Sequence, residues 1–328
     1  MTENLNSEDQ RPQGAPEAKQ MRTVSIIVPV YCNAESLPHL VTELDWLENE
    51  LKEHNVAIET IFVDDGSDDD SYAILRELKT TRERTIIVKL TRNFGAIPAT
   101  KAGLEFVTGD AMCILAADLQ DPLEQVKKMV EVWLTGRKFV ISERRTRQDS
   151  ATTKFLAGLY YAFFRFLVMP DYPRRGFDLM IVDKELLPKL RKIGKYTALE
   201  LFAFWLGYEP VILQYERRDR QHGQSKWTLR KKIHYAIDNF TGFSIIPLRI
   251  TSAIGVTTAL LSFFYGLFMI ASVLIYGSEF PGFPTVATLV AFLSGLILLS
   301  LGIIGEYLWR IYDNINGKPD SVIETVHD

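Results

Sequence analysis

The sequence contains little cysteine and no excess of positive charge. Only Cys32 and Cys113 occur among its 328 residues. Both fall in or just after predicted strands of the part expected in the cytoplasm, so we interpret them as packing residues rather than a disulfide. The formal net charge of -4 argues against nucleic acid as a partner. Neither a glycine-rich dinucleotide signature nor a Walker loop follows the first predicted strand, which excludes NAD-dependent enzymes and P-loop nucleotide hydrolases.

Two long stretches lack charged residues, namely 250–278 and 280–305. Each exceeds the roughly 20 apolar residues that cross a bilayer about 30 Å thick. Buried core helices are the alternative, but they rarely run so far without a charge. The pattern therefore favours transmembrane helices at 247–277 and 284–309. Lys and Arg precede the first stretch and follow the second but are absent between them, which predicts that both ends lie in the cytoplasm.

The segments outside the apolar stretches are also interpreted. Residues 1–21 are polar and lack an apolar core, which predicts a disordered tail rather than a signal peptide. Residues 310–328 are expected to form a cytoplasmic tail. Small residues in the second apolar stretch allow close helix approach, so a homo-oligomer is expected. These residues are Gly295, Gly302 and Gly305.

Residues 22–227 are expected to form one domain. In its first part, β-branched runs alternate with amphipathic segments, and such alternation implies βαβ crossovers. Strands are predicted at 24–30, 57–63, 85–90, 111–117 and 139–142, and helices at 36–54, 70–80, 96–107 and 122–135. The predicted fold class is therefore α/β with a mostly parallel sheet, to which the apolar helices are appended.

Two further segments are typical of helices that lie in a membrane interface. Residues 154–169 are rich in aromatic side chains, and a juxtamembrane helix at 228–246 begins with Arg230, Lys231 and Lys232. Such helices place apolar side chains among lipid and basic ones at the headgroups. A core helix for the first segment and a plain linker for the second remain alternatives.

Polar residues follow the predicted strands. Tyr31 follows the first strand and Asp65 the second, while Asp118 and Gln120 follow the fourth. In open α/β sheets, ligands bind at the carboxyl ends of the strands. Carboxylate and amide oxygens suit a hard cation such as Mg²⁺ or Mn²⁺, which in turn suits a substrate that carries phosphates.

Eight short motifs follow one another along the chain. They are Pro29-Val30-Tyr31 with Asn33, Val63-Asp64-Asp65-Gly66-Ser67, Arg92-Asn93-Phe94-Gly95, Ala102-Gly103-Leu104, Asp118-Leu119-Gln120-Asp121-Pro122, Gly223-Gln224-Ser225-Lys226, Pro247-Leu248-Arg249 and Gly305-Glu306-Tyr307. In this order the chain resembles the polyprenyl-phosphate glycosyltransferases of glycosyltransferase family 2, which include dolichol-phosphate mannose synthases and bacterial undecaprenyl-phosphate glucosyltransferases. The resemblance covers about residues 23–319 and implies a GT-A-type catalytic domain.

The resemblance implies how the nucleotide sugar is bound. It places Asp65 on the donor base, between Pro29 and Tyr31, and a carboxylate can accept a hydrogen bond from a base N–H. The alternative is that Asp64 and Asp65 only shape a turn. The family's Asn-Glu-Glu motif reads Asn33-Ala34-Glu35 in this chain, so Glu35 is the only candidate for that carboxylate.

The resemblance also implies a metal site. It places Mg²⁺ or Mn²⁺ on Asp118 and Gln120, with Asp118 also contacting the nucleotide sugar. Ala116 replaces an acid of the family, which puts that one contact in doubt rather than the metal. Asp121 is interpreted as the N-cap of the following helix, with Glu124 completing a capping pair, and a catalytic role for Asp121 is the alternative.

Basic residues complete the implied site. Arg144 and Arg147 match catalytic positions that the family uses around the diphosphate and the acceptor phosphate. Arg220 and Lys226 are expected to bind a lipid phosphate, and attraction to the membrane surface is the alternative. Asp178 lies where relatives place an acid or polar residue near the acceptor.

The expected function is inverting transfer of a hexose, glucose from UDP-glucose, to a polyprenyl phosphate. The location implied is the cytoplasmic face of the inner cell membrane, in cell-envelope glycosylation. Another donor, either GDP-mannose or a UDP-amino sugar, is an open alternative. So is a non-catalytic membrane scaffold that binds nucleotide, because Ala34 and Ala116 stand where relatives carry acids.

Overall fold

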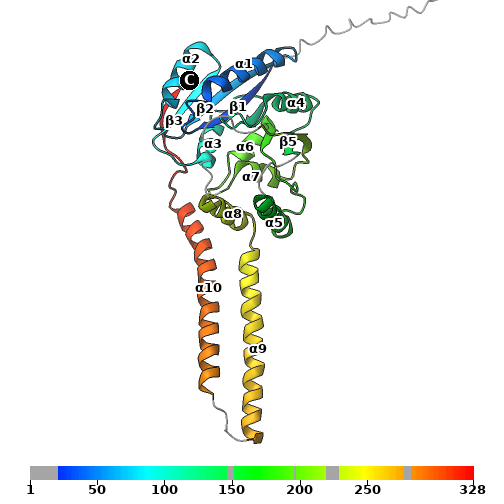
Figure 1. The fold of residues 1–328 in the computed structure, drawn as a ribbon, viewed down its shortest axis with the longest axis vertical. Helices are drawn as coiled ribbons and strands as arrows, with labels where there is room; N and C mark the ends of the chain where they lie inside the picture. The colour runs from blue at the N-terminus through cyan, green and yellow to red at the C-terminus, as the bar shows by residue number, and fades with distance from the viewer. Residues whose placement is uncertain (1–20, 146–150, 196, 219–228, 277–281) are drawn as a thin grey trace, which may run out of the picture.

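The globular part of the chain is built on one eight-stranded sheet (Figure 1). The computed structural model describes residues 21–145, 151–195, 197–218, 229–276 and 282–328. The strand order is β7-β5-β6-β4-β1-β2-β3-β8. The strands are β1 (Arg22–Val30), β2 (Val56–Asp64), β3 (Thr85–Leu90), β4 (Ala111–Ile114), β5 (Phe139–Arg144), β6 (Leu179–Asp183), β7 (Val211–Tyr215) and β8 (Ile323–His327). The β4-β1-β2-β3 core is parallel, whereas β6 and β8 pair antiparallel with their neighbours.

Helices cover both faces of this sheet, as the alternating sequence pattern predicts. They are α1 (Leu37–Lys52), α2 (Ser71–Thr81), α3 (Ala96–Leu104), α4 (Leu123–Leu134), α5 (Ala151–Leu167), α6 (Leu187–Leu190), α7 (Leu199–Trp205), α8 (Leu229–Phe243), α9 (Ile246–Tyr276) and α10 (Phe283–Ile315). One core joins α1, α2 and α4 to one face of the sheet, and a second joins α3, α5, α6 and α7 to the other. In β1, Ile26 belongs to the first core and Ile27 to the second, because successive side chains of a strand point to opposite faces.

The predicted α/β class with a mostly parallel sheet is confirmed, with differences at the element ends. The strand predicted at 111–117 ends at Ile114. The Leu115 N–H still donates to the Ile27 carbonyl, 2.9 Å away, but the chain then leaves the sheet. It enters a turn in which Leu119 has a φ of +59°. The apolar run therefore continues past the strand because its residues stay buried inside the turn.

The carboxyl-terminal segment differs most from expectation. Residues 310–328, expected as a tail, contain the end of α10 and strand β8, which adds an antiparallel edge beside β3. Side chains fasten this strand: Lys89 pairs with Glu324 at 2.9 Å, and the Tyr72 hydroxyl lies 2.8 Å from His327 Nε2. The chain that leaves α10 thus supplies one edge strand of the sheet.

Removing residues 319–328 is expected to lower the melting temperature of the full-length protein by about 5–10 °C, because several ladder hydrogen bonds and buried contacts are lost together. Lys101, which is 9% exposed, also loses its ion pair with Asp320. Intrinsic fluorescence during heating in detergent measures the change. Removing Asp328 alone keeps the last ladder pair, Ile87 with His327, and serves as the control. Equal melting of all three chains would show that β8 adds no stability.

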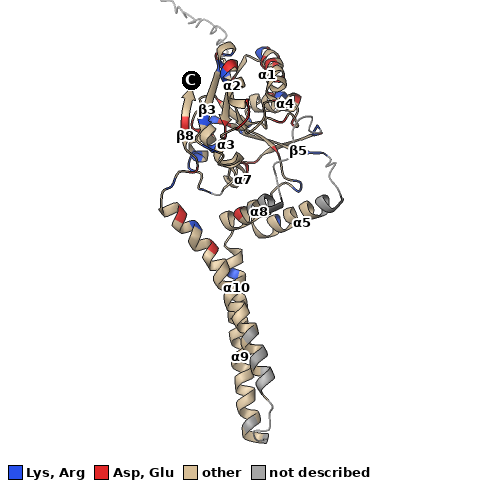
Figure 2. Ribbon diagram, turned by 60° about the vertical axis from the view of Figure 1, so that its left-hand side comes forward, with Lys and Arg blue, Asp and Glu red and all other residues tan. Residues whose placement is uncertain are grey.

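Helices α9 and α10 extend side by side away from the globular part (Figures 1 and 2). Each contains a segment long and apolar enough to cross a membrane, Ile246–Ser272 and Phe292–Ile315. The 18-residue apolar window within each segment has no buried residue, so the core-helix alternative is wrong for them. Figure 2 shows charged residues on the globular part and on the nearby ends of the two helices. There, Arg310 of α10 pairs with Asp238 of α8 at 2.6 Å.

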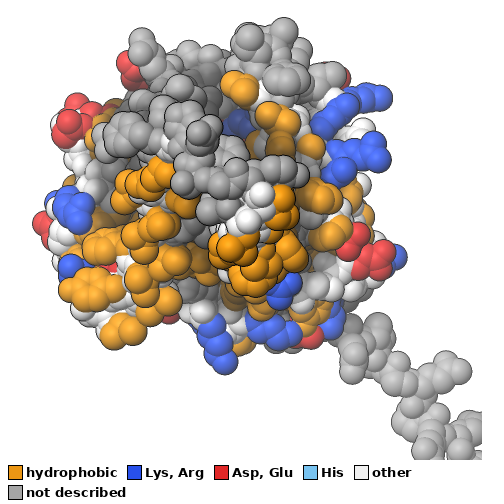
Figure 3. All heavy atoms as spheres, turned by 90° about the horizontal axis from the view of Figure 1, so that it is seen from below, with side chains coloured by type: hydrophobic (Ala, Val, Ile, Leu, Met, Phe, Trp, Pro, Cys, Tyr) orange, Lys and Arg blue, Asp and Glu red, His pale blue; other side chains and the backbone are white. Residues whose placement is uncertain are grey.

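Helix α5 has one buried and one exposed apolar face. Phe164 is fully buried, whereas Phe163 is 50% and Phe166 is 82% exposed. Trp205 of α7 and Ile233 of α8 are also exposed. Figure 3 shows apolar surface on this side of the molecule, with charged side chains of both signs at its edge. The core-helix alternative for α5 therefore holds for one face only, and the other face suits a membrane interface.

Candidate active site

The loops at the carboxyl ends of β1, β2 and β4 meet, as the sequence predicts. The Cys32 N–H donates to the Ser67 hydroxyl at 3.0 Å, which joins the β1 and β2 loops. The Ser36 hydroxyl donates to the Ala117 carbonyl at 2.8 Å, which joins the β1 and β4 loops. Polar side chains from three strand ends therefore share one edge of the sheet.

Asp65 is buried at this edge of the sheet. Its carboxylate is 2% exposed and accepts hydrogen bonds from the Phe94 N–H at 2.7 Å and the Gly95 N–H at 2.8 Å. Gly66 has a φ of +65°, and a Cβ there would lie 2.4 Å from the Arg92 carbonyl carbon. This close approach requires glycine. The Asp-Gly pair thus holds the β3 loop against the β2 loop.

Asp64 is also a buried part of this turn. Its carboxylate accepts a hydrogen bond from the Ser67 N–H at 3.4 Å, and burial raises its pKa. The Asp64 side chain therefore contributes to its own turn, whereas that of Asp65 joins two loops. Base recognition by Asp65 stays a prediction, and a carboxylate has lone pairs enough for both roles.

The other residues predicted to bind the nucleotide sugar lie at the end of β1. Pro29 and Tyr31 are half-buried, and the Tyr31 N–H donates to the Asn33 side chain at 3.0 Å. Cys32 has a φ of +50°, a strained conformation for a residue that is not glycine. Glu35 is exposed one residue before Ser36. The structure brings these residues to the shared edge, and their contacts with a donor stay predictions.

Asp118 and Gln120 flank a buried residue. Leu119 is 6% exposed, whereas Asp118 and Gln120 are half-buried. The Gln120 N–H donates to Asp118 Oδ1 at 3.2 Å, which holds the turn. Two oxygen-bearing side chains thus flank an anchored leucine, and this donor set fits a hard divalent cation. Among the described residues, no three His, Cys, Asp or Glu side chains cluster to hold a metal.

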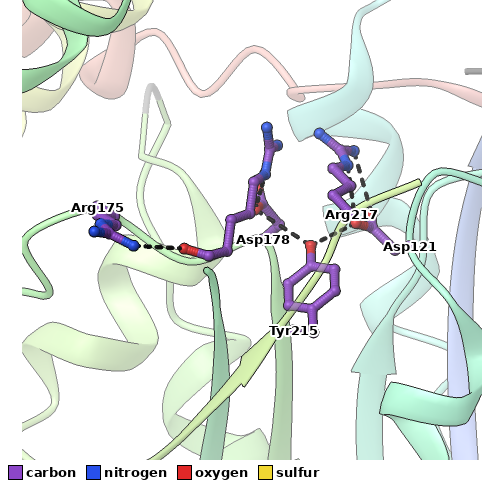
Figure 4. Close-up of polar contacts among 6 residues, drawn as sticks. Asp121, Arg175, Asp178, Tyr215 and Arg217 are labelled. Carbon is purple, nitrogen blue, oxygen red and sulfur yellow. Dashed lines mark hydrogen bonds and ion pairs between the residues drawn. The ribbon is translucent and has the colours of Figure 1, made fainter. Parts of the chain in front are cut away.

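Asp121 does not cap helix α4, so that prediction is wrong. The N-cap is Pro122, without a capping side chain, and Glu124 pairs with Arg218. The Asp121 carboxylate is 3% exposed and points instead toward strand β7 (Figure 4). It accepts a hydrogen bond from the Tyr215 hydroxyl at 2.6 Å and pairs with Arg217 at 3.0 Å. Burial raises its pKa, and the charge of Arg217 opposes that shift.

Arg144 lies at the end of β5 and pairs with Asp178. Both oxygens of Asp178 accept hydrogen bonds from the guanidinium group, one of them at 2.6 Å from Nη2. Burial alone would lower the pKa of Arg144, but the bonds to Asp178 raise it, so the group stays charged. The Tyr215 hydroxyl lies 3.3 Å from Asp178. The Tyr215 hydroxyl therefore lies between two ion pairs. One is Asp121 with Arg217, and the other is Asp178 with Arg144.

Sequence reasoning missed the roles of Tyr215 and Arg217. Arg217 stood in a run of basic residues that suggested a membrane surface, and β7, which carries Tyr215, was not predicted. Arg147, Arg220 and Lys226 lie outside the described residues, so their roles stay predictions. Directly before the segment that contains Arg220 and Lys226, the Arg218 N–H donates to the Gln120 carbonyl at 2.9 Å, beside the candidate metal site.

The chain is similar to known proteins in both sequence and structure. The profile of the family described as "Glycosyl transferase family 2" matches residues 25–191. The SfII prophage-derived bactoprenol glucosyl transferase of Shigella flexneri is 30% identical over 306 residues, which cover 93% of this chain and 98% of the relative. An uncharacterized glycosyltransferase of Synechocystis is 32% identical over 299 residues, covering 90% and 93%.

Solved structures with a similar chain path include a mannosyltransferase of Pyrobaculum calidifontis in complex with GDP-Man and Mn²⁺. Its TM-score is 0.44 at 17% identity, with 92% of this chain and 91% of that chain covered. A glucosyl-3-phosphoglycerate synthase of Mycobacterium tuberculosis in complex with Mn²⁺, UDP and phosphoglyceric acid has a TM-score of 0.48 at 19% identity, covering 67% and 76%.

Proposed function

This chain belongs to glycosyltransferase family 2, and we propose from that premise that it transfers glucose from UDP-glucose to a polyprenyl phosphate with inversion. One observation carries the proposal. Relatives named bactoprenol glucosyl transferase match the chain over nearly their full length, through the apolar helices as well as the globular part. A lipid-linked acceptor explains why the two parts occur together. GDP-mannose and UDP-amino sugars remain alternative donors.

The proposed acceptor determines what the site must do. A phosphate monoester is already anionic near neutral pH, so its oxygen needs no general base to become a nucleophile. Two negatively charged reactants must instead be brought together, which requires positive charge and positioning. Arg144 is proposed to supply that charge, with Arg147, Arg220 and Lys226 completing the acceptor-phosphate site. The two bonds to Asp178 leave further N–H groups of Arg144 for a phosphate.

The proposed leaving-group site lies on the β4 loop. Asp118 and Gln120 would hold Mg²⁺ or Mn²⁺, which supplies positive charge to the departing nucleoside diphosphate. Pro29, Tyr31, Glu35 and Asp65 are proposed to bind the nucleotide sugar. Because β4 lies next to β1, both sets of residues can contact one donor molecule.

The proposed location is the cytoplasmic face of the cell membrane, with α9 and α10 as a transmembrane hairpin. The exposed aromatic face of α5 and the apolar surface in Figure 3 would then meet lipid. A homo-oligomer remains part of the proposal. A Cβ added at Gly295, Gly302 or Gly305 would meet no atom within 4 Å, so this surface of α10 has room for another helix.

Transfer can be measured with purified full-length protein in detergent, labelled UDP-glucose and polyprenyl phosphate. Label is expected in the organic phase, and EDTA is expected to reduce its appearance by about 100-fold or more because the leaving group loses its counter-charge. Added Mn²⁺ or Mg²⁺ should restore transfer. If EDTA leaves the rate unchanged, the metal proposal is wrong. If no label is transferred from UDP-glucose, GDP-mannose or a UDP-amino sugar, the scaffold alternative is favoured.

A further inference from the structure

The hydroxyl of Tyr215 lies between two carboxylates (Figure 4). It is 2.6 Å from Asp121 Oδ1 and 3.3 Å from Asp178 Oδ2, and the tyrosine is 5% exposed. A phenol donates one proton, so it can donate to only one of the two acids at a time. Burial raises the pKa of Tyr215, which keeps that proton in place. The hydroxyl therefore reduces the repulsion between two neighbouring negative charges.

Each acid also holds one arginine. Asp178 accepts two hydrogen bonds from Arg144, and Asp121 pairs with Arg217 through Nε at 3.0 Å and Nη2 at 3.3 Å. The side chains of Arg144 and Arg217 are 20% and 19% exposed, so both reach the surface from a buried base. Parallel pairing of β5 and β7 places Arg144 directly beside Tyr215. The two guanidinium groups are thus held from one side by a single connected set of side chains.

This set of side chains also joins the donor side to the acceptor side. Asp121 follows Gln120, and the Arg218 N–H donates to the Gln120 carbonyl at 2.9 Å. Arg217 and Arg218 directly precede the segment that contains Arg220 and Lys226.

We infer that Tyr215 is a positioning residue, which ties Asp121 to Asp178 so that Arg144 and Arg217 bind the phosphate monoester of the acceptor as a pair. This inference rests on the proposed function, because it names the ligand of the same site. It adds Arg217 to the acceptor-phosphate site. Guanidinium groups held in place by neighbouring acids lose less freedom on binding a phosphate than mobile ones do.

Calorimetric titration with farnesyl phosphate tests the inference without requiring turnover. In full-length protein in detergent, Tyr215→Phe is expected to weaken farnesyl phosphate binding by about 10-fold, because one charge-assisted hydrogen bond no longer holds the pair. Binding of UDP should change by less than about 2-fold, since Tyr215 acts on the acceptor side. Tyr208→Phe removes a hydroxyl that contacts Lys189, away from the site, and should bind both ligands as the natural protein does.

A second variant separates positioning from general destabilisation. Arg217→Gln is expected to weaken farnesyl phosphate binding as well, and the double variant should be less than additive because both changes act through Asp121. Unchanged binding in Tyr215→Phe, an additive double variant, equal weakening of UDP, or no binding of farnesyl phosphate by the natural protein would each overturn the inference. If the natural protein binds farnesyl phosphate but transfers no sugar, the proposed function fails while the inference about phosphate binding stands.

Discussion

Replacing Asp118 with asparagine is expected to reduce sugar transfer by at least about 1,000-fold, because the candidate metal site loses its one charged ligand. The side chain is half-buried, and its Oδ1 accepts a hydrogen bond from the Gln120 N–H at 3.2 Å. Asparagine keeps the size of the side chain and can accept the same bond through its amide oxygen. The fold should therefore survive, and the loss should appear in the transfer step.

The measurement compares initial rates of labelled lipid formation with melting temperatures of the same preparations. Glu105→Gln removes an exposed carboxylate at the end of α3 and is expected to leave both unchanged. Asp118→Asn should melt within about 2 °C of the natural protein, because asparagine keeps the size of the side chain and can still accept from the Gln120 N–H. It should also lose the extra stabilisation by UDP that added Mn²⁺ gives the natural protein. A rate within 10-fold of natural turnover would contradict a metal role for Asp118.

The parallel half of the sheet could be predicted because its strands are buried on both faces. Such strands read as continuous apolar runs, and β3 was predicted and observed with the same bounds, Thr85–Leu90. Helices α1 and α4 show the 3.6-residue spacing of buried leucines and valines that the pattern requires. Local periodicity was enough for the strands β1 to β5.

The two edge strands could not be predicted in the same way. β7 and β8 lie at the two edges of the sheet and are only partly buried, so their residues do not form an apolar run. β8 pairs with β3 across most of the length of the chain. No local sequence signal predicts that pairing. It depends on the position of the end of α10 in the folded protein.

In the candidate site, too, some residues could be placed from the sequence and others could not. Asp65, Asp118 and Gln120 could be placed together because each follows a parallel strand. Asp121 was misassigned because capping rules use only neighbouring residues, whereas its partners come from β7. A buried carboxylate is held by a distant tyrosine and arginine more strongly than by the helix that it precedes. Long-range pairing of this kind requires the structure.

Replacing Asp65 with asparagine is expected to lower the melting temperature of the protein by about 5–10 °C even without nucleotide, because its carboxylate joins two loops. Both oxygens accept hydrogen bonds from backbone N–H groups, of Phe94 at 2.7 Å and of Gly95 at 2.8 Å, in a site that is 2% exposed. Asparagine offers one acceptor and turns an NH₂ group toward the other donor. A buried N–H would be left unsatisfied, which costs about 1–3 kcal/mol in addition to the lost charge-assisted bond.

The same variant separates the two roles considered for Asp65. Asp70→Asn, at the exposed N-cap of α2 where no side-chain capping bond forms, is the matched control and should melt normally. If Asp65 both joins the loops and binds the donor base, Asp65→Asn loses stability and also loses the further stabilisation that UDP gives. Lower stability with a normal UDP effect would assign Asp65 to the loop contact alone. Normal melting would contradict the loop contact, because two buried hydrogen bonds cannot be altered without a measurable change.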